Sequence, residues 1–460
     1  MNLPNSPKTS PWLQLIQWIA NPFGLLEDCA KSYGDTFTLR LGKLPPLVFF
    51  SNPQAIQEIF TADASQFDVG RANRIIEPLV GANSILLQDG DRHQRQRRLL
   101  MPPFHGERMR NYGQLICEIT EEVTSQWEIG NPLTIRTAMQ EITLQVILHV
   151  VFGLREGPRY QQLKPLLASL LDMTGSPLRS SILFFNFLQQ DWGAWSPWGR
   201  MIQRRRMVYD LLYAEIAERR QQFNPDRTDI LTLLLSARDE QGETLTNEEL
   251  GDELMTLLVA GHETTATALA WAFYWIHQLP LVRETLLNEL ATLGDRPDPM
   301  KISSLPYLNA VCQETLRIYP VVPIAVPRVT KSPLRIGAEQ FEPNTRLTPC
   351  IYLTHHREDL YPDSKQFKPE RFLERQFSPY EYLPFGGGNR RCIGFALAQF
   401  EMKLVLATVL SNYELELTEQ HPVKPVRRGV TLAPASGVKM VVQGRRQQGG
   451  GKQQVLASSL

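Results

Sequence analysis

The sequence lacks a charge excess, a cysteine framework and a long apolar run, and each absence excludes a class of protein. Lysine plus arginine and aspartate plus glutamate both number 48, so there is no basic surplus of the kind that nucleic-acid binding requires. The five cysteines form no C-x-x-C pair, which argues against a disulfide scaffold or a zinc ribbon and favours the reducing cytoplasm. We see neither a signal peptide nor a transmembrane anchor.

The first apolar stretch does carry a helical pattern. Trp12, Leu15, Ile16 and Ile19 fall at helical spacing, which predicts a short amphipathic helix. We favour packing of this helix on the body of the protein. The alternative is peripheral contact with a membrane surface, where a lipophilic substrate would be dissolved.

Helical patterns dominate the rest of the chain, without internal repeats or long linkers. Strand-like runs are short and comprise 37–41, 47–51 and 438–442. The sequence therefore predicts a single domain over residues 1–444 that is mainly α with a minor β-sheet. Residues 445–460 are rich in Gln and Gly, and we predict that they form a disordered tail.

One predicted helix is unusually long. Thr246 and Glu249 have the spacing of a capping box, and the pattern runs from Asn247 to Leu279 before Pro280 stops it. Its second half is apolar on nearly all sides, which indicates a helix buried in the domain. Two further helices are predicted, over 306–319 and from Cys392 to about residue 411.

A glycine-rich loop precedes the last of these helices. Its pattern is F-x-x-G-x-R-x-C-x-G, formed by Phe385, Gly388, Arg390, Cys392 and Gly394. Because the helix terminus stabilises an anion, we expect the thiol to ionise readily and to suit a metal. An isolated cysteine is more often a structural thiol, but five fixed positions in ten residues rarely match by chance.

The loop resembles the haem-binding loop of the cytochromes P450, in which a cysteine thiolate ligates the haem iron. With the further segments below, the resemblance extends from about Leu13 to Val442. It implies a single-domain P450-type helical prism, with haem b between the long central helix and the Cys-loop helix. It also implies that Cys392 is the axial ligand.

Within the long helix, the segment 260–265 (A-G-H-E-T-T) matches the family's oxygen-activation segment. The resemblance implies that Ala260 and Gly261 leave room for a diatomic ligand. Thr264 would relay a proton, with Glu263 as its acid partner. The alternative is a packing notch for a crossing helix, with the threonine bonded to its own turn.

Two more sets of residues gain meaning from the resemblance. Glu314 and Arg317, three residues apart, would join Arg371 in a buried ion network that holds the cysteine loop, although such a pair is usually a solvated surface pair. The resemblance also implies a set of donors for the haem propionates. These donors are His93, Arg97, Arg328 and Arg390.

The activity implied is hydroxylation of a hydrophobic small molecule, a fatty acid or a terpenoid, with O2. The expected substrate pocket includes Leu257, Leu258, Val321, Ile324, Ala325 and Ala433. Arg71 or Arg74 would anchor a carboxylate, which slightly favours a fatty acid. Because the chain has no room for a flavin or ferredoxin module, electrons would come from a separate ferredoxin with its reductase. Arg95, Arg98 and Arg110 are candidates for docking it, and we expect a monomer.

Two other functions stay open from the sequence. Some relatives use peroxide or rearrange fatty-acid hydroperoxides, but they usually lack the acid–alcohol pair that Glu263 and Thr264 supply. A non-enzymatic haem sensor would use the thiolate only as a ligand, and the long buried helix with its small residues argues against it.

Overall fold

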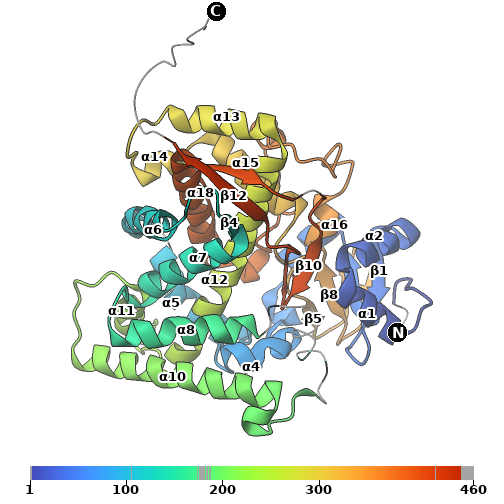
Figure 1. Ribbon diagram of the computed structural model, residues 1–460. Coiled ribbons are helices and arrows are strands. Elements are labelled where there is room, and N and C mark those ends of the chain that lie inside the picture. Colours follow the sequence, from blue (N-terminus) through green and yellow to red (C-terminus); the bar gives the residue numbers. More distant parts are fainter. Residues whose placement is uncertain are drawn as a thin grey trace, which may run out of the picture.

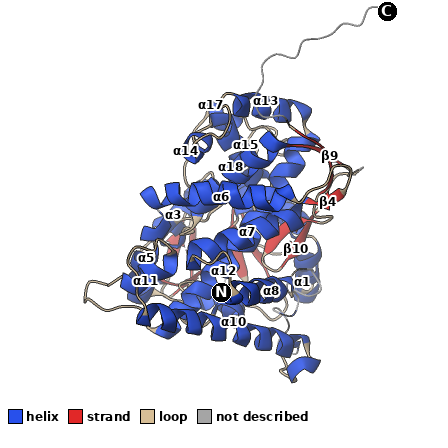
Figure 2. Ribbon diagram, turned by 60° about the vertical axis from the view of Figure 1, so that its left-hand side comes forward, coloured by secondary structure: helices blue, strands red, loops and turns tan. Residues whose placement is uncertain are grey.

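A computed structural model of the protein describes residues 3–104, 106–173, 175, 182, 185, 188–419 and 421–446. Helices form most of this part of the chain, and the strands gather toward one side of them (Figures 1 and 2). The mainly α architecture with a minor β component is as predicted. Strand β12 continues to Arg445, one residue into the predicted tail, and residues 447–460 lie outside the described part.

The helices account for nearly every predicted helical segment. The α-helices are α1 (Pro11–Ala20), α2 (Pro22–Tyr33), α3 (Pro53–Thr61), α4 (Glu77–Val80), α5 (Gly90–Leu100), α6 (Glu107–Ser125), α7 (Ile135–Phe152), α8 (Pro158–Asp172), α10 (Pro197–Gln221), α11 (Ile230–Ser236), α12 (Asn247–Gln278), α13 (Pro280–Ala291), α14 (Pro299–Ser303), α15 (Pro306–Ile318), α16 (Ile351–His355), α17 (Arg371–Glu374) and α18 (Phe395–Asn412). The short 3-10 helices are η1 (Ala64–Gln66), η2 (Gly70–Ile76), η3 (Pro102–Phe104), η6 (Gly193–Trp195) and η7 (Gly388–Arg390).

The strands form small sheets, most of which the sequence patterns did not indicate. They are β1 (Thr36–Leu39), β2 (Leu47–Phe50), β3 (Phe67–Asp68), β4 (Pro132–Thr134), β5 (Arg328–Thr330), β6 (Leu334–Ile336), β7 (Glu339–Phe341), β8 (Arg346–Pro349), β9 (Tyr413–Leu417), β10 (Pro425–Arg428), β11 (Thr431–Pro434) and β12 (Lys439–Arg445). The largest sheet has the order β1-β2-β8-β5-β3, and a second has the order β4-β12-β9. Strands β10–β11 and β6–β7 form two-stranded pairs.

Helix α12 runs through the middle of the molecule (Figure 1). Its start is the predicted capping box: the Glu249 N–H donates to Thr246 Oγ1, and the Thr246 N–H donates to Glu249 Oε2, both at 3.1 Å. The helix packs most extensively on α7 and also contacts α10, α15 and α18. Because neighbours cover it on all sides, its apolar second half lies in the core, as predicted.

Helix α1 is amphipathic in a different register from the one predicted. Leu15 and Trp18 are buried, whereas Trp12 and Ile16 are exposed. The buried face follows the contacts that α1 makes with α2 and β10, which apolar spacing alone does not specify. Among the described residues, no helix is long and apolar enough to cross a membrane.

Candidate functional site

The cysteine loop lies between α17 and α18 and closes back on itself. The Cys392 N–H donates to the Phe385 carbonyl at 3.0 Å, and the Arg391 N–H donates to the Gly388 carbonyl at 3.2 Å. Gly386 and Gly388 have φ of +68° and +62°, which favours glycine at both positions. These bonds explain how the F-x-x-G-x-R-x-C sequence sets the position of the thiol before α18 begins.

The glycines of this loop serve different purposes. A Cβ at Gly387 would lie 2.3 Å from ring atoms of Phe60, so this position must be small to pack. A Cβ at Gly394 would meet no atom within 4 Å, and its φ of −88° does not require glycine. The absence of a side chain at Gly394 therefore leaves open space near Cys392, which would allow a bound group to approach the loop closely.

This contrast gives a testable prediction. We expect Gly387→Ala to destabilise the fold by about 1–3 kcal/mol because the Phe60 ring must move. We expect Gly394→Ala to leave the thermal midpoint of the haem-free protein unchanged but to lower its haem occupancy. Differential scanning fluorimetry and the absorbance ratio at the Soret and protein bands measure the two effects. Equal haem occupancy in Gly394→Ala and wild type would contradict the assignment.

The Cys392 thiol has accessible surface, yet protein surrounds it closely. Burial raises its pKa, and the Gly394 N–H and the charges of Arg97 and Arg391 only partly oppose the rise. The prediction that the helix terminus makes the Cys392 thiol ionise readily is therefore wrong for the chain on its own, since its pKa is raised. A coordinated metal ion deprotonates a thiol outright, so metal binding is what the site needs to hold a thiolate.

Three cationic side chains from separate elements converge on the cysteine loop. Arg97 of α5 donates from Nη1 to the Arg391 carbonyl at 2.8 Å. Arg328 of β5 donates from Nη2 to the Gly387 carbonyl at 3.1 Å. Arg390 belongs to the loop itself, and His93 is buried one turn before Arg97. The predicted donor set is thus brought together around one loop.

The cations in this set repel one another. Burial, together with the charges of Arg390, Arg97 and Arg328, lowers the pKa of His93 to about 3. Burial, with Arg390 nearby, also lowers the pKa of Arg328 to about 9. Among the residues that the structure describes, no carboxylate lies within ion-pair distance of Arg328. A buried arginine without a carboxylate partner fits a site for an anionic group.

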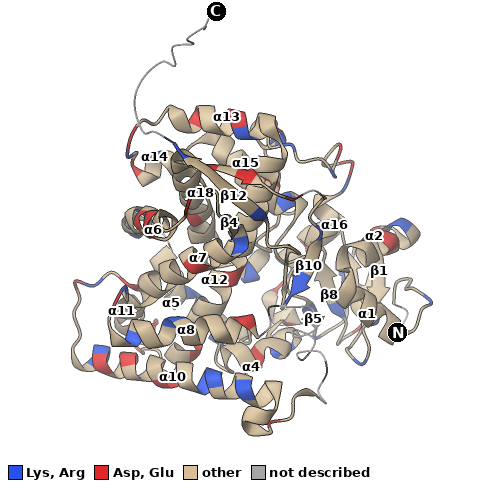
Figure 3. Cartoon of the chain, in the orientation of Figure 1, with Lys and Arg blue, Asp and Glu red and all other residues tan. Residues whose placement is uncertain are grey.

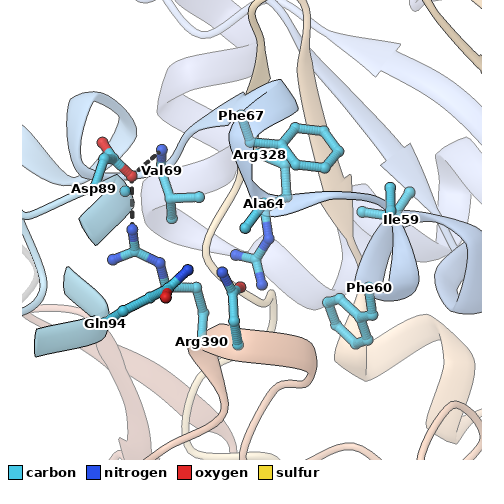
Figure 4. A pocket seen from close by; sticks show the side chains of 12 residues that line it. Ile59, Phe60, Ala64, Phe67, Val69, Asp89, Gln94, Arg328 and Arg390 are labelled. Carbon is cyan, nitrogen blue, oxygen red and sulfur yellow. Dashed lines mark hydrogen bonds and ion pairs between the residues drawn. The ribbon is translucent and has the colours of Figure 1, made fainter. Parts of the chain in front are cut away.

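Arg390 is already held by an acid that the sequence did not single out. It donates to Asp89 Oδ1 and to the Gln88 carbonyl, both at 2.6 Å, while its Nε atom has no hydrogen-bond partner. Asp89 in turn accepts from the Val69 N–H at 2.8 Å. Figure 4 shows this arrangement, with Arg328 and Arg390 on the same small cavity of about 10 Å³. Asp89 balances one of the converging charges and leaves the others for a ligand.

The middle of α12 is accessible, whereas the turns on either side of it are buried. Leu250 to Leu258 are buried, Ala260 is exposed, and Gly261 and Thr264 are partly exposed. Thr264 Oγ1 donates to the Ala260 carbonyl at 2.6 Å, the bond expected for a threonine that bonds to its own turn. The helix therefore offers a small residue and a hydroxyl on the face that side chains leave uncovered.

Glu263 points to a neighbouring helix, a partnership that the sequence did not reveal. Its carboxylate accepts from Arg136 and from Gln140 Nε2 of α7, the latter at 2.8 Å. Thr267 Oγ1 donates to the same carboxylate at 3.4 Å. Glu263 is thus fixed in the position next to Thr264 in the chain. Among the hydrogen bonds of the described residues, none joins the Glu263 carboxylate to the Thr264 hydroxyl.

Two residues of α12 that the sequence assigns to the site, Gly261 and Leu258, pack against other parts of the protein. A Cβ at Gly261 would lie 2.8 Å from Ile147 Cδ1, so its small size serves the contact between α12 and α7. Leu258 is buried in the core and lies roughly 200° around the helix from Ala260, on the opposite face. A helix of about 100° per residue places Leu257, and not Leu258, near the Ala260 face.

The remaining predicted pocket residues differ in exposure. Val321 and Ile324 are partly exposed, so both can line a pocket. Ala325 and Ala433 are buried by protein neighbours.

The predicted ion network is present and buried. Arg317 donates to Glu314 through Nε at 2.6 Å and through Nη2 at 2.8 Å, and both side chains have no accessible surface. Arg371 Nε donates to the same carboxylate at 3.1 Å. The network reaches the cysteine loop through His355, whose carbonyl accepts from Arg317 and whose Nε2 accepts from the Leu383 N–H. His355 is thus engaged in the core, and no cluster of metal-ligating side chains occurs in the described part of the chain.

Comparison with known proteins agrees with this geometry. The family model described as cytochrome P450 matches residues 4–441. The chain is a cytochrome P450. It is 36% identical to the Mycobacterium tuberculosis protein named cytochrome P450 135B1 over 97% of this chain and 92% of that protein. It is 32% identical to cytochrome P450 138 of the same species, over 97% of each chain.

Solved P450 structures have the same fold. The retinoic-acid-bound cyanobacterial CYP120A1 superposes with a TM-score of 0.82 at 25% identity, covering 96% of this chain and 99% of that one. The haem domain of cytochrome P450DA has a TM-score of 0.83 at 23% identity, over 96% and 98% of the chains. This P450 is therefore an oxidoreductase of the haem-thiolate monooxygenase family, with iron protoporphyrin IX as its cofactor.

Proposed function

We propose that this P450 hydroxylates a hydrophobic small molecule, a fatty acid or a terpenoid, using O2 and electrons from a separate ferredoxin. The observation that carries the proposal is the cysteine loop, which Arg97 and Arg328 bind from two other elements. The accessible Ala260–Thr264 face of α12 supports it. A non-enzymatic haem sensor would need the cysteine loop, but it would not need the Thr264 hydroxyl and the fixed Glu263 carboxylate on the accessible face of α12.

The residues of the site have separate roles toward the haem. Cys392 would supply the thiolate that holds the haem iron, and Phe385, Gly388 and Gly394 would shape the loop around it. His93, Arg97, Arg328 and Arg390 would bind the propionates, for which the unpaired charge of Arg328 is the support. When bound, the haem supplies the oxygen activation and the transfer of one oxygen atom to a C–H bond.

Thr264 and Glu263 would control the proton. The Thr264 hydroxyl donates to Ala260 O, which fixes its orientation and leaves the lone pairs of its oxygen able to accept a hydrogen bond. Arg136 and Gln140 hold the Glu263 carboxylate in position for a water-mediated link. The acid would resupply protons to the hydroxyl, and the partly exposed Glu263 would exchange them with solvent.

This role predicts a loss of coupling. We expect Thr264→Ala to consume reductant at near the wild-type rate while product per electron pair falls about 100-fold or more, because proton delivery is lost. Glu263→Gln should slow product formation without changing substrate affinity. The measurements are product yield and reductant oxidation in the same reaction. Thr267→Ala, which alters a neighbouring hydroxyl at the same acid, is the control, and full coupling in Thr264→Ala would contradict the role.

The substrate class rests on the apolar surroundings of the site. Leu257 lies near the Ala260 face of α12, and Val321 and Ile324 are partly exposed apolar residues. Arg71 is held by Asn344 at 2.7 Å, which weakens the argument for a carboxylate anchor there. CYP120A1 was solved with retinoic acid, an isoprenoid carboxylic acid. This likeness supports a terpenoid as a candidate substrate class alongside a fatty acid.

Two of the three arginines suggested for ferredoxin docking, Arg95 and Arg98, are paired with acidic side chains. Arg95 is paired with Asp239 at 2.5 Å, and Arg98 is paired with Glu240, so both charges are locally compensated. Arg391 lies in the cysteine loop itself, and it and Arg110 are exposed. We propose these two arginines as contacts for an acidic ferredoxin.

The test is a turnover screen with the haem-loaded protein. Long-chain fatty acids and sesquiterpenes are titrated while the Soret band is recorded, and the ligands that shift it are incubated with a ferredoxin, its reductase and NADPH. The expected result is a hydroxylated product that requires O2 and the ferredoxin. Product formed with hydrogen peroxide alone, and not with the ferredoxin system, would replace the proposal by the peroxide-using alternative.

A further inference from the structure

Residues 81–88, which we name the strap, connect α4 to α5 through turns and lie against α12. Helix α12 passes close to α4, and Figure 3 shows acidic residues in red in this part of the molecule. Glu253 of α12 is fully buried beside the strap. We propose that Glu253 is a proton-dependent positioning residue, which in its neutral form keeps the strap closed on α12 so that the strap holds Arg390 in place for a haem propionate. The proposal rests on the role toward the propionates that is proposed above for Arg390.

Two polar contacts fasten the strap to α12. The Asn83 N–H and its Nδ2 atom donate to Asp252 Oδ2 at 2.8 and 3.0 Å. The hydroxyls of Thr256 and Ser84 are joined by a hydrogen bond of 2.7 Å. Glu253 therefore lies in the chain between the two residues of α12 that bind the strap.

The strap also binds the cysteine loop. Arg390 donates from Nη1 to the Ile85 carbonyl at 3.3 Å and from Nη2 to the Gln88 carbonyl at 2.6 Å. Its further acceptor among the described residues is Asp89, which follows the strap directly. If the strap moved away from α12, Arg390 would lose the two carbonyls and would keep only the ion pair with Asp89. The position of the strap therefore controls the orientation of this arginine.

Glu253 lacks the partners that a buried charge needs. Its side chain is 0% exposed, and neither carboxyl oxygen has a hydrogen-bond partner in the described part of the chain. The charged groups that act on it are Asp252 and Glu249 of α12 and Arg92 of α5, and the strap itself carries no charged side chain. Burial raises the pKa of Glu253 well above its usual range, the Ile85 N–H and Arg92 oppose the rise only in part, and the two acids add to it. The carboxyl group therefore stays neutral at pH values at which an exposed glutamate is ionised.

The proton on Glu253 is linked to the position of the strap. An ionised carboxylate in the closed contact would be a buried and unpaired charge, whereas an open strap would let water solvate it. In the open state the group titrates near a pKa of about 4.3, as an exposed glutamate does, and in the closed state it titrates at a higher pH. Each pH unit above about 4.3 therefore favours the open state by up to about tenfold, until the pH passes the closed-state pKa. A rising pH should thus release the strap and, with it, Arg390.

The first measurement is hydrogen–deuterium exchange of the haem-loaded full-length protein, as wild type and as Glu253→Gln, from about pH 5 to about pH 8. Glutamine has nearly the same shape as glutamate but cannot ionise. The ratio of the two exchange rates at each pH cancels the intrinsic pH dependence of exchange. We expect this ratio to rise by up to about tenfold per pH unit for the strap amides and to stay constant for the amides of α18. Glu253→Met, which also cannot ionise and leaves no unpaired amide, should behave like Glu253→Gln.

The second measurement is the rate of haem loss to an excess of apomyoglobin, followed at the Soret band. The rate for the wild type relative to Glu253→Gln should rise with pH in parallel with the exchange of the strap, because Arg390 then loses its acceptors. Protonation of a thiolate ligand acts in the opposite direction, at low pH, and affects both proteins alike. In Arg390→Gln, haem loss should be fast at every pH, and the addition of Glu253→Gln should no longer slow it.

The matched control is Glu401→Gln, which removes a buried acid of α18. Glu401 Oε1 also has no hydrogen-bond partner, and burial raises the pKa of this group to about 8. This variant should keep the wild-type pH dependence of the strap amides. Equal pH dependence of the strap in the wild type and in both Glu253 variants would overturn the proposal, and so would haem loss that stays constant while the strap opens. Neither measurement requires turnover, so failure of this proposal is distinguishable from failure of the proposed hydroxylation.

Discussion

Replacement of Cys392 by alanine should abolish the red-shifted Soret band of the dithionite-reduced, carbon-monoxide-bound protein and reduce hydroxylation to background. The physical reason is that the thiolate donates electron density to the iron and favours O–O cleavage, which a neutral ligand does not. Among the cysteines, Cys29, Cys312 and Cys350 are buried and their pKa values are raised by burial, which marks them as inert core thiols.

The matched control is Cys117→Ser, which changes a partly buried thiol on α6. We expect this variant to keep the red-shifted band and full activity. Cys392→Ala should also keep the helical circular dichroism spectrum, because the loop is held by the bonds of Arg97 and Arg328 to Arg391 and Gly387 rather than by the thiol. An unchanged carbon monoxide spectrum in Cys392→Ala would show that the iron has another ligand and would remove the basis of the proposed site.

The helices of the site were predictable because their signals are local. The capping box at Thr246 and Pro280 fix the two ends of α12 almost to the residue. Pro306 likewise marks the first turn of α15. Most strands were missed because they have only two to five residues and owe their pairing to distant segments, as in the parallel pairing of β2 with β8.

The partners of site residues were the least predictable part. The sequence indicates that Glu263 and Arg390 belong to a site, but nothing near them in the chain points to Arg136 or Asp89, more than 100 residues away. The same holds for His355, which links the ion network to the cysteine loop. Such contacts arise from tertiary packing, and a single sequence carries no signal for them.

The turn of about 100° per residue in a helix excludes Leu258 from the predicted pocket, and this exclusion could have been made from the sequence alone. The sequence predicts Leu258 in the pocket because it is apolar and close to Ala260 in the chain. At about 100° per residue, however, it lies on the face that packs into the core. For Gly261, the packing notch explains the glycine, since Ile147 of α7 occupies the space where a side chain would be.

Replacement of Arg317 by methionine should destabilise the protein by about 3–5 kcal/mol and prevent stable haem incorporation. The change leaves the Glu314 carboxylate buried with one ion-pair partner fewer, and it removes the donors to the His355, Ser364 and Gln366 carbonyls. Because the His355 ring accepts from the Leu383 N–H, two residues before Phe385, the disturbance passes directly to the cysteine loop. Urea unfolding and haem content after purification measure the two effects.

The matched control is the surface pair of Arg98 and Glu240, whose side chains are 60% and 68% exposed. Glu240→Gln should cost less than about 1 kcal/mol, because water already solvates both groups. Glu314→Gln/Arg317→Met, which removes both charges, should recover part of the stability lost in Arg317→Met because the uncompensated charge is gone. Haem binding should stay impaired because the hydrogen bonds to the His355, Ser364 and Gln366 carbonyls are not restored. If the single variant were as stable as Glu240→Gln, the buried pair would contribute nothing to holding the loop. Recovery of haem binding in the double variant would show that charge compensation, and not the hydrogen bonds through His355, positions Cys392.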